Sequence, residues 1–67
     1  MKLQDGIYFN VAYGLVMQVK DGVVNGRSLK KDEDYEILEM NCITFGGTFY
    51  RMHAYGRKDL YKLEELH

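Results

Sequence analysis

The sequence has few of the features that stabilise a very small protein covalently or through a metal. Its 67 residues contain one cysteine, two histidines, no proline and no tryptophan. One cysteine excludes an internal disulfide, and the cysteines and histidines are too few for a structural zinc site. The length predicts one domain, residues 1–67. Without such staples, a chain of this size needs a well-packed core, oligomerisation, or both.

Neither sign of charge is in excess. Nine Lys and Arg stand against ten Asp and Glu, which gives a net charge of −1. Nucleic-acid-binding domains typically have a basic excess or a basic face, so the composition does not favour nucleic acid, although a local patch stays open. No apolar run is long enough to span a membrane, and no signal peptide is visible. Together with the lone cysteine, these absences predict a cytoplasmic protein.

What the sequence does contain is alternation with a period of two. In residues 7–19 every odd position is apolar or aromatic, which predicts a half-buried strand. Such a strand is unusually long, and Gly14 is the natural place for a break. We prefer a bend at Gly14 within one strand, because the phase of the alternation does not change there. A tight turn between two shorter strands is the alternative.

The next segment carries a hairpin signal. Asp21-Gly22 between apolar runs predicts a type I′ turn, which pairs Val19 with Val24. A second pair of this kind, asparagine and glycine at 25–26, follows too soon for another full strand. We expect a β-bulge or the start of a loop at 25–26.

Residues 28–36 are polar and predict a loop. The acidic residues in this stretch are Asp32, Glu33, Asp34 and Glu36. Surface charges are mostly just solvated, so the first interpretation is a solvated loop tip. The second interpretation is an acidic contact that steers a basic partner.

Beyond this loop the alternation changes phase. Tyr35 and Ile37 share one phase, whereas Leu38, Met40 and Cys42 share the other. One extra residue in a strand shifts the phase in this way. The pattern therefore predicts a β-bulge between Ile37 and Leu38.

Glycines 46 and 47 predict a second hairpin, whose register depends on the length of the loop. A two-residue loop pairs Phe45 with Thr48, whereas a three-residue loop pairs Phe45 with Phe49. A slip of one residue turns a whole strand over, so the register that separates apolar from polar side chains is the better choice. That is the three-residue loop, which places on one face Leu38, Met40, Cys42, Tyr50, Met52 and Ala54.

The last segment predicts a turn at 56–59, a short strand at 59–63 and a helical turn at 63–66. The alternative is a short C-terminal helix capped by Asp59. The sum is an all-β fold, a small antiparallel sheet of five or six short strands that curls into a partly open barrel. In architecture it resembles a small SH3-like barrel.

The sequence contains no motif of catalysis. Cys42 and His53 are the obvious reactive pair, but the preferred register points them to opposite faces. A metal site needs three or four converging ligands, and a cysteine nucleophile needs a base within reach. The glycines lack the spacing and the lysine of a phosphate-binding loop. We therefore expect no enzyme, no metal and no cofactor.

One polar and aromatic face is left as a candidate binding surface. In the preferred register Ile43 lies on it, and aromatic residues and arginine are the types enriched at the centres of interfaces. The alternative is that another part of the chain covers this face. The candidate binding residues are Phe45, Phe49, Arg51, His53, Tyr55 and Arg57.

These observations predict a non-enzymatic protein–protein interaction module, a small adaptor or inhibitor of the kind that phages and mobile elements carry. The alternative is a small barrel that binds nucleic acid by stacking bases on aromatic residues. A third hypothesis is that the same face serves homo-oligomerisation.

Overall fold

The computed structural model of the chain describes residues 3–67, except for the side chains at 57 and 58. These residues form one antiparallel sheet of seven strands in the spatial order β3-β2-β1-β7-β6-β5-β4, and none of them is helical. The all-β class is confirmed, whereas the count of five or six strands is not. The strands are β1 (Gly6–Asn10), β2 (Leu15–Lys20), β3 (Val23–Ser28), β4 (Tyr35–Leu38), β5 (Cys42–Phe45), β6 (Thr48–Tyr55) and β7 (Arg57–Glu65).

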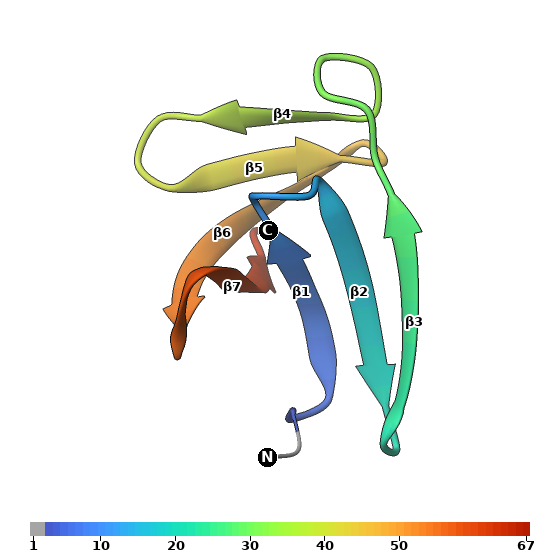
Figure 1. Cartoon of the computed structure of the whole chain (residues 1–67). Coiled ribbons are helices and arrows are strands. Elements are labelled where there is room, and N and C mark those ends of the chain that lie inside the picture. The colour runs from blue at the N-terminus through green and yellow to red at the C-terminus, as the bar shows by residue number, and fades with distance from the viewer. Residues whose placement is uncertain (1–2) are drawn as a thin grey trace.

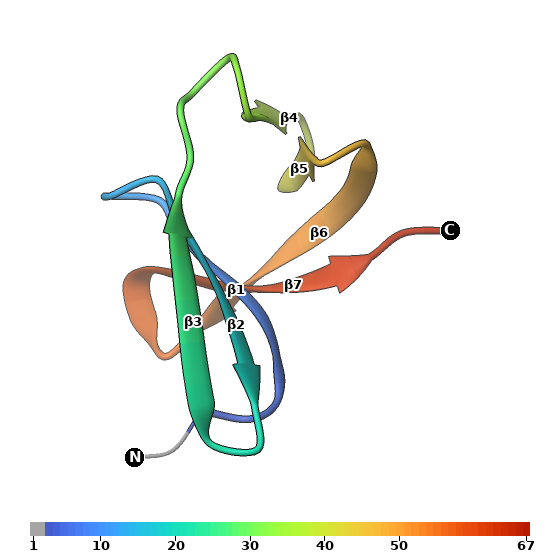
Figure 2. The same cartoon turned by 90° about the vertical axis from the view of Figure 1, so that its right-hand side faces the viewer.

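The sheet curls into a half-barrel. In Figure 1, β4 and β5 cross over one end of β1, β2 and β3 instead of running alongside them. β3 and β4 are the two edges of the sheet, and the loop at 29–34 connects them across the open side (Figure 2). The prediction of a small barrel-like sheet is therefore confirmed. The side of the sheet that faces the interior of the curl is called the inner face below, and the opposite side the outer face.

The first two strands are a hairpin, so the prediction of one bent strand is wrong. β1 and β2 pair antiparallel with Asn10 opposite Leu15, and residues 11–14 form the turn. The Asn10 side-chain oxygen Oδ1 accepts a hydrogen bond from the Tyr13 amide at 3.2 Å, which closes the turn. Gly14 has φ +61°, and a Cβ atom there would lie 3.1 Å from the Leu29 carbonyl oxygen. Both observations favour glycine at this position.

The second hairpin forms as predicted. Val19 pairs with Val24 around a two-residue turn in which Asp21 and Gly22 both have positive φ, the type I′ geometry. The bulge or loop predicted at 25–26 is wrong. Those residues continue β3 in regular pairing with β2. β3 is therefore a full strand of six residues, as long as its partner β2.

The predicted bulge between Ile37 and Leu38 is also wrong. β4 ends at Leu38, and a turn at 39–41 leads into β5 with Leu38 opposite Cys42. Met40 and Asn41 adopt φ of 62° and 59° in this turn, and the Met40 side chain is 79% exposed. The phase change in the sequence was therefore the signature of a reversal of the chain.

The glycine pair makes a two-residue turn, so the preferred three-residue register is wrong. Phe45 lies opposite Thr48, and Gly46 and Gly47 have φ of 60° and 80°. Positive φ at both central positions is what a type I′ turn requires, and glycine adopts it without strain. In this register Ile43 pairs with Tyr50. Cys42 therefore leaves the predicted core and lies on the face opposite to Tyr50.

The C-terminal helical turn is not confirmed, because β7 continues as a strand to Glu65. The turn predicted at 56–59 is shorter than expected. Gly56 alone separates β6 from β7, with φ +69°. β7 then runs between β6 and β1 and joins the two halves of the sheet.

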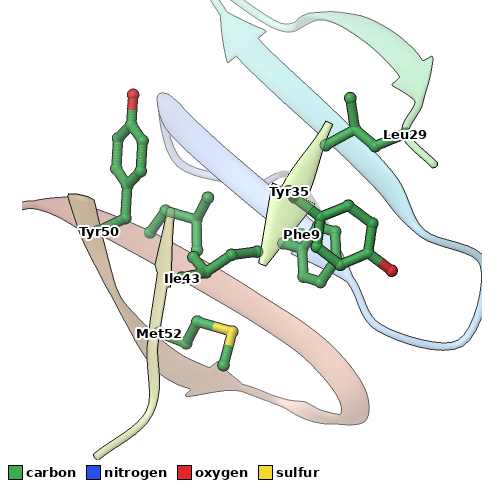
Figure 3. Packing of buried hydrophobic residues seen from close by; sticks show 7 residues of the cluster. Phe9, Leu29, Tyr35, Ile43, Tyr50 and Met52 are labelled. Atoms are coloured by element: carbon green, nitrogen blue, oxygen red, sulfur yellow. The ribbon is translucent and has the colours of Figure 1, made fainter. Parts of the chain in front are cut away.

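The main core lies on the inner face. Phe9 and Ile43 are completely buried there, and the Phe9 ring meets the Tyr35 ring edge to face at 5.1 Å between centroids. Figure 3 shows side chains from β1, β4, β5, β6 and the loop after β3 meeting in this cluster. Its buried members are Phe9, Leu29, Tyr35, Ile43, Tyr50, Met52 and Leu63.

A second, smaller core lies on the outer face of β1, β2 and β7. Tyr8 is completely buried there between Val19 and Leu60, and Tyr55 packs against this group. β1 is thus buried on both faces, because it lies between β2 and β7 and has one of the two cores on each face. The two cores leave the outer face of β5, and that of β6 before Tyr55, uncovered by any of their members.

Candidate protein-binding face

β6 presents four of the predicted binding residues on one face of the sheet. Alternation along a strand places Phe49, Arg51, His53 and Tyr55 together, because side chains two residues apart point to the same side. The inner face of β6 carries Tyr50 and Met52, which belong to the main core as predicted. The four predicted binding residues of β6 therefore lie on its outer face.

Phe45 does not belong to this surface. The two-residue turn places it on the inner face, where its ring stacks on Tyr50 with centroids 4.7 Å apart and an interplanar angle of 16°. Ile43 is likewise buried in the main core. Both had been expected on the binding face. Arg57 begins β7, and its side chain lies outside the described residues.

Phe49, Arg51 and His53 are the accessible part of the predicted set. The Phe49 side chain is 56% exposed, which is unusual for a phenylalanine, and Arg51 is half-buried beside it. Across the described residues, no carboxylate lies within salt-bridge distance of the Arg51 guanidinium. The guanidinium is therefore not neutralised by a neighbour in the fold.

The reason that Arg51 has no salt bridge lies on the neighbouring strand, β7. Glu64 on β7 lies directly opposite Arg51 in the register. However, its carboxylate oxygen Oε1 bonds to the His53 ring nitrogen Nε2 at 2.8 Å. The Glu64 carboxylate, which could have paired with Arg51, is thus bonded to His53. Because both partners are largely exposed, the His53–Glu64 contact itself contributes little to stability.

The register adds two residues that sequence reasoning placed elsewhere or left out. Cys42 lies opposite Arg51, and Thr44 lies opposite Phe49. Both are partly exposed on the outer face. Cys42, Thr44, Phe49 and Arg51 are called the outer patch below. The signal that could have found Cys42 and Thr44 is the glycine pair itself, because a type I′ turn fixes this register.

Tyr55 contributes to the smaller core instead of the outer patch. Its ring meets the Tyr8 ring edge to face, with centroids 5.1 Å apart. The Tyr8 hydroxyl donates a hydrogen bond to the Gln4 carbonyl oxygen at 2.6 Å. The alternative explanation, that another part of the chain covers the residue, therefore holds for Tyr55.

The buried Tyr8 hydroxyl predicts a loss of stability at alkaline pH. Burial raises its pKa above the ordinary value, and the neighbouring Tyr55 and Asp5 raise it further. Because the unfolded chain loses this proton first, we expect the free energy of unfolding to fall as pH rises from about 10 towards the folded-state pKa. Urea titrations at a series of pH values measure this decline. The Tyr8→Phe variant should decline less steeply, and an equal slope in both proteins would contradict the assignment.

Cys42 and His53 share the outer face, so the prediction that they point to opposite faces is wrong. Each of the two side chains bonds to a different neighbour. The Cys42 thiol Sγ donates to the Met40 carbonyl oxygen at 3.6 Å, and His53 bonds to Glu64. Within the described part of the chain, no group of three His, Cys, Asp or Glu side chains comes together to hold a metal ion.

The acidic loop is organised by its own residues. The Asp34 carboxylate oxygen Oδ2 accepts a hydrogen bond from the Lys30 amide at 2.8 Å, and Lys30 Nζ lies 3.9 Å from the Glu33 carboxylate. All of its carboxylates are exposed. A shallow hollow of about 280 Å³ separates this loop from the turn at 46–47. Residues 29–34 lie on the open side of the half-barrel, whereas Glu36, which was predicted in the same loop, belongs to β4 and lies opposite Thr44 of the outer patch.

Comparison with known proteins gives no relative. No protein-family model matches the chain, and no curated protein or solved structure is significantly similar to it. Over residues 3–67, no helix is long and apolar enough to cross a membrane.

Proposed function

We propose that the chain is a non-enzymatic protein–protein interaction module that binds a larger protein through the outer patch, as an adaptor or an inhibitor. The observation that carries this proposal is the pair formed by Phe49 and Arg51. An exposed phenylalanine beside an unneutralised arginine combines the two features that dominate interface centres, a large apolar contact and a directional cation. Both side chains project from a strand held by neighbours on each side.

The pair also indicates the chemistry of the partner. Because no carboxylate of the described residues forms a salt bridge with Arg51, the complementary surface should place a carboxylate against the guanidinium and an apolar pocket against Phe49. The net charge of −1 gives the protein no general attraction to nucleic acid. A protein partner is therefore favoured over a nucleic acid, and the lone thiol fits an intracellular setting.

The test compares matched variants in quantitative affinity capture from a lysate of the source cells, followed by titration with the purified captured protein. We expect Phe49→Ala and Arg51→Glu each to weaken binding by about 2 kcal/mol or more, which is about 30-fold in Kd. Tyr13→Ala and Lys20→Glu are the controls, because both residues are exposed and lie away from the outer patch.

Three results would contradict the proposal. Binding that survives in both outer-patch variants would exclude this surface. Binding that Tyr13→Ala abolishes would move the site to the turn at 11–14. Capture that disappears after nuclease treatment and weakens steeply with salt would favour the nucleic-acid alternative.

A further inference from the structure

β3 is a free edge of the sheet, and it is separate from the outer patch. It ends the strand order on one side, and all six of its residues are exposed. Val23 and Val24 are each more than half exposed, at 59% and 52%. Sheet edges are usually protected by proline, charged side chains, a bulge or a covering loop. Among the described residues, β3 carries one charge, that of Arg27, and has no proline and no bulge.

The register shows which backbone groups of β3 are unpaired. β3 pairs with β2 around a two-residue turn, and the Leu29 amide donates to the Gly14 carbonyl at 2.8 Å just beyond the strand. Because hydrogen-bonded pairs alternate along an antiparallel ladder, positions 23, 25 and 27 bond to β2. The amides and carbonyls of Val24, Gly26 and Ser28 therefore point away from the sheet.

A cleft adjoins this edge on the inner face. It has a volume of about 290 Å³, and Val16, Arg27 and Phe45 are among its lining residues. Phe45 also lines the hollow beside the acidic loop, so the two depressions meet at this ring. No carboxylate of the described residues lies within salt-bridge distance of Arg27. The cleft thus combines apolar walls with one unneutralised cation.

We propose that β3 binds an extended segment of a partner protein, which adds to the seven-stranded sheet as a further strand. Unpaired backbone groups along an exposed strand are the feature that strand addition uses for affinity, and adjoining pockets select alternate side chains. The segment's residues opposite positions 25 and 27 would point into the cleft. We expect an acidic residue there against Arg27 and an apolar residue against Phe45.

Charge complementarity favours a partner segment over the β3 strand of a second copy of the chain. β3 contains one cation and no carboxylate. Antiparallel pairing of two β3 strands would therefore place no anion opposite either Arg27. This proposal does not depend on the outer patch, and the two surfaces can fail separately.

The test selects peptides from a phage-displayed random library on the wild-type protein and then measures amide hydrogen exchange by NMR with a selected peptide bound. We expect enrichment of alternating sequences that carry an acidic residue. The amides of Val24, Gly26 and Ser28 should exchange more than roughly tenfold more slowly in the complex. Arg27→Glu should replace the enriched acid by Lys or Arg.

A backbone variant gives a second readout. Gly26→Pro removes one outward amide without removing a bond to β2, so the fold should persist while peptide binding falls by more than roughly tenfold. Three outcomes would overturn the proposal: no enrichment, selected peptides that leave the three amides unprotected, or protection of these amides by concentration-dependent dimerisation without peptide. Peptides lost with Phe49→Ala but retained with Gly26→Pro would also overturn it, and would leave the proposed function standing.

Discussion

Replacement of Phe9 by alanine is expected to leave the domain largely unfolded in water. Phe9 is completely buried in β1, and its ring packs edge to face against Tyr35. Removing a buried phenylalanine side chain typically costs about 3–5 kcal/mol. At roughly 0.05–0.15 kcal/mol per residue, a domain of this length has only about 3–10 kcal/mol in total. The substitution therefore removes most or all of the stability.

Urea unfolding followed by circular dichroism measures this effect. Tyr13→Ala is the matched control, because Tyr13 is also aromatic but 78% exposed in the turn at 11–14. We expect the control to unfold within about 0.5 kcal/mol of the wild type. A Phe9→Ala variant that loses less than about 1 kcal/mol would be inconsistent with a core centred on β1.

The second large effect is expected from a charge at Ile43. The side chain is completely buried opposite Tyr50, so aspartate at this position would place a carboxylate in the main core without a partner. An unpaired buried charge costs several kcal/mol, and we expect Ile43→Asp to abolish the folded state.

The neighbouring residue supplies the control. Thr44→Asp adds the same charge on the outer face, where the side chain is partly exposed, and should be tolerated. Near-UV circular dichroism and amide dispersion in NMR spectra report the folded state of each variant. In the alternative register Ile43 would face outward, so a folded Ile43→Asp protein would contradict the two-residue turn.

The parts of the fold that could be predicted are those set by local geometry. Asp21-Gly22 specified its own hairpin because few other residues accept positive φ at both central positions. The separation of Tyr50 and Met52 from Arg51 and His53 followed from alternation within one strand. Neither inference required knowledge of which segments pack together.

The failures in the first strand and in the hairpin at 46–47 arose where apolar residues lie in turns. Val11 and Tyr13 continued the alternation of β1 across a turn, although both are exposed. Met40 extended the apolar phase of the next segment, although it adopts a left-handed conformation in the turn at 39–41. Choosing the register that grouped Met40 with the core then displaced Phe45 to the wrong face.

The candidate site could be predicted only in part, because exposure is a tertiary property. Alternation put Phe49, Arg51, His53 and Tyr55 on one side of β6. It could not show that Tyr55 packs on Tyr8, which lies far away in the sequence. The bond of Glu64 to His53, and not to Arg51, likewise depends on the pairing of β6 with β7.

The central claim is that the two-residue turn at Gly46-Gly47 decides which side chains the hairpin exposes. The most direct test is a nuclear Overhauser measurement between α-protons of β5 and β6. The Met52 amide donates to the Asn41 carbonyl, which makes Thr44 and Phe49 a non-hydrogen-bonded pair with closely approaching α-carbons. We predict a strong contact between the α-protons of Thr44 and Phe49. A contact between Thr44 and Tyr50 in its place would contradict the claim.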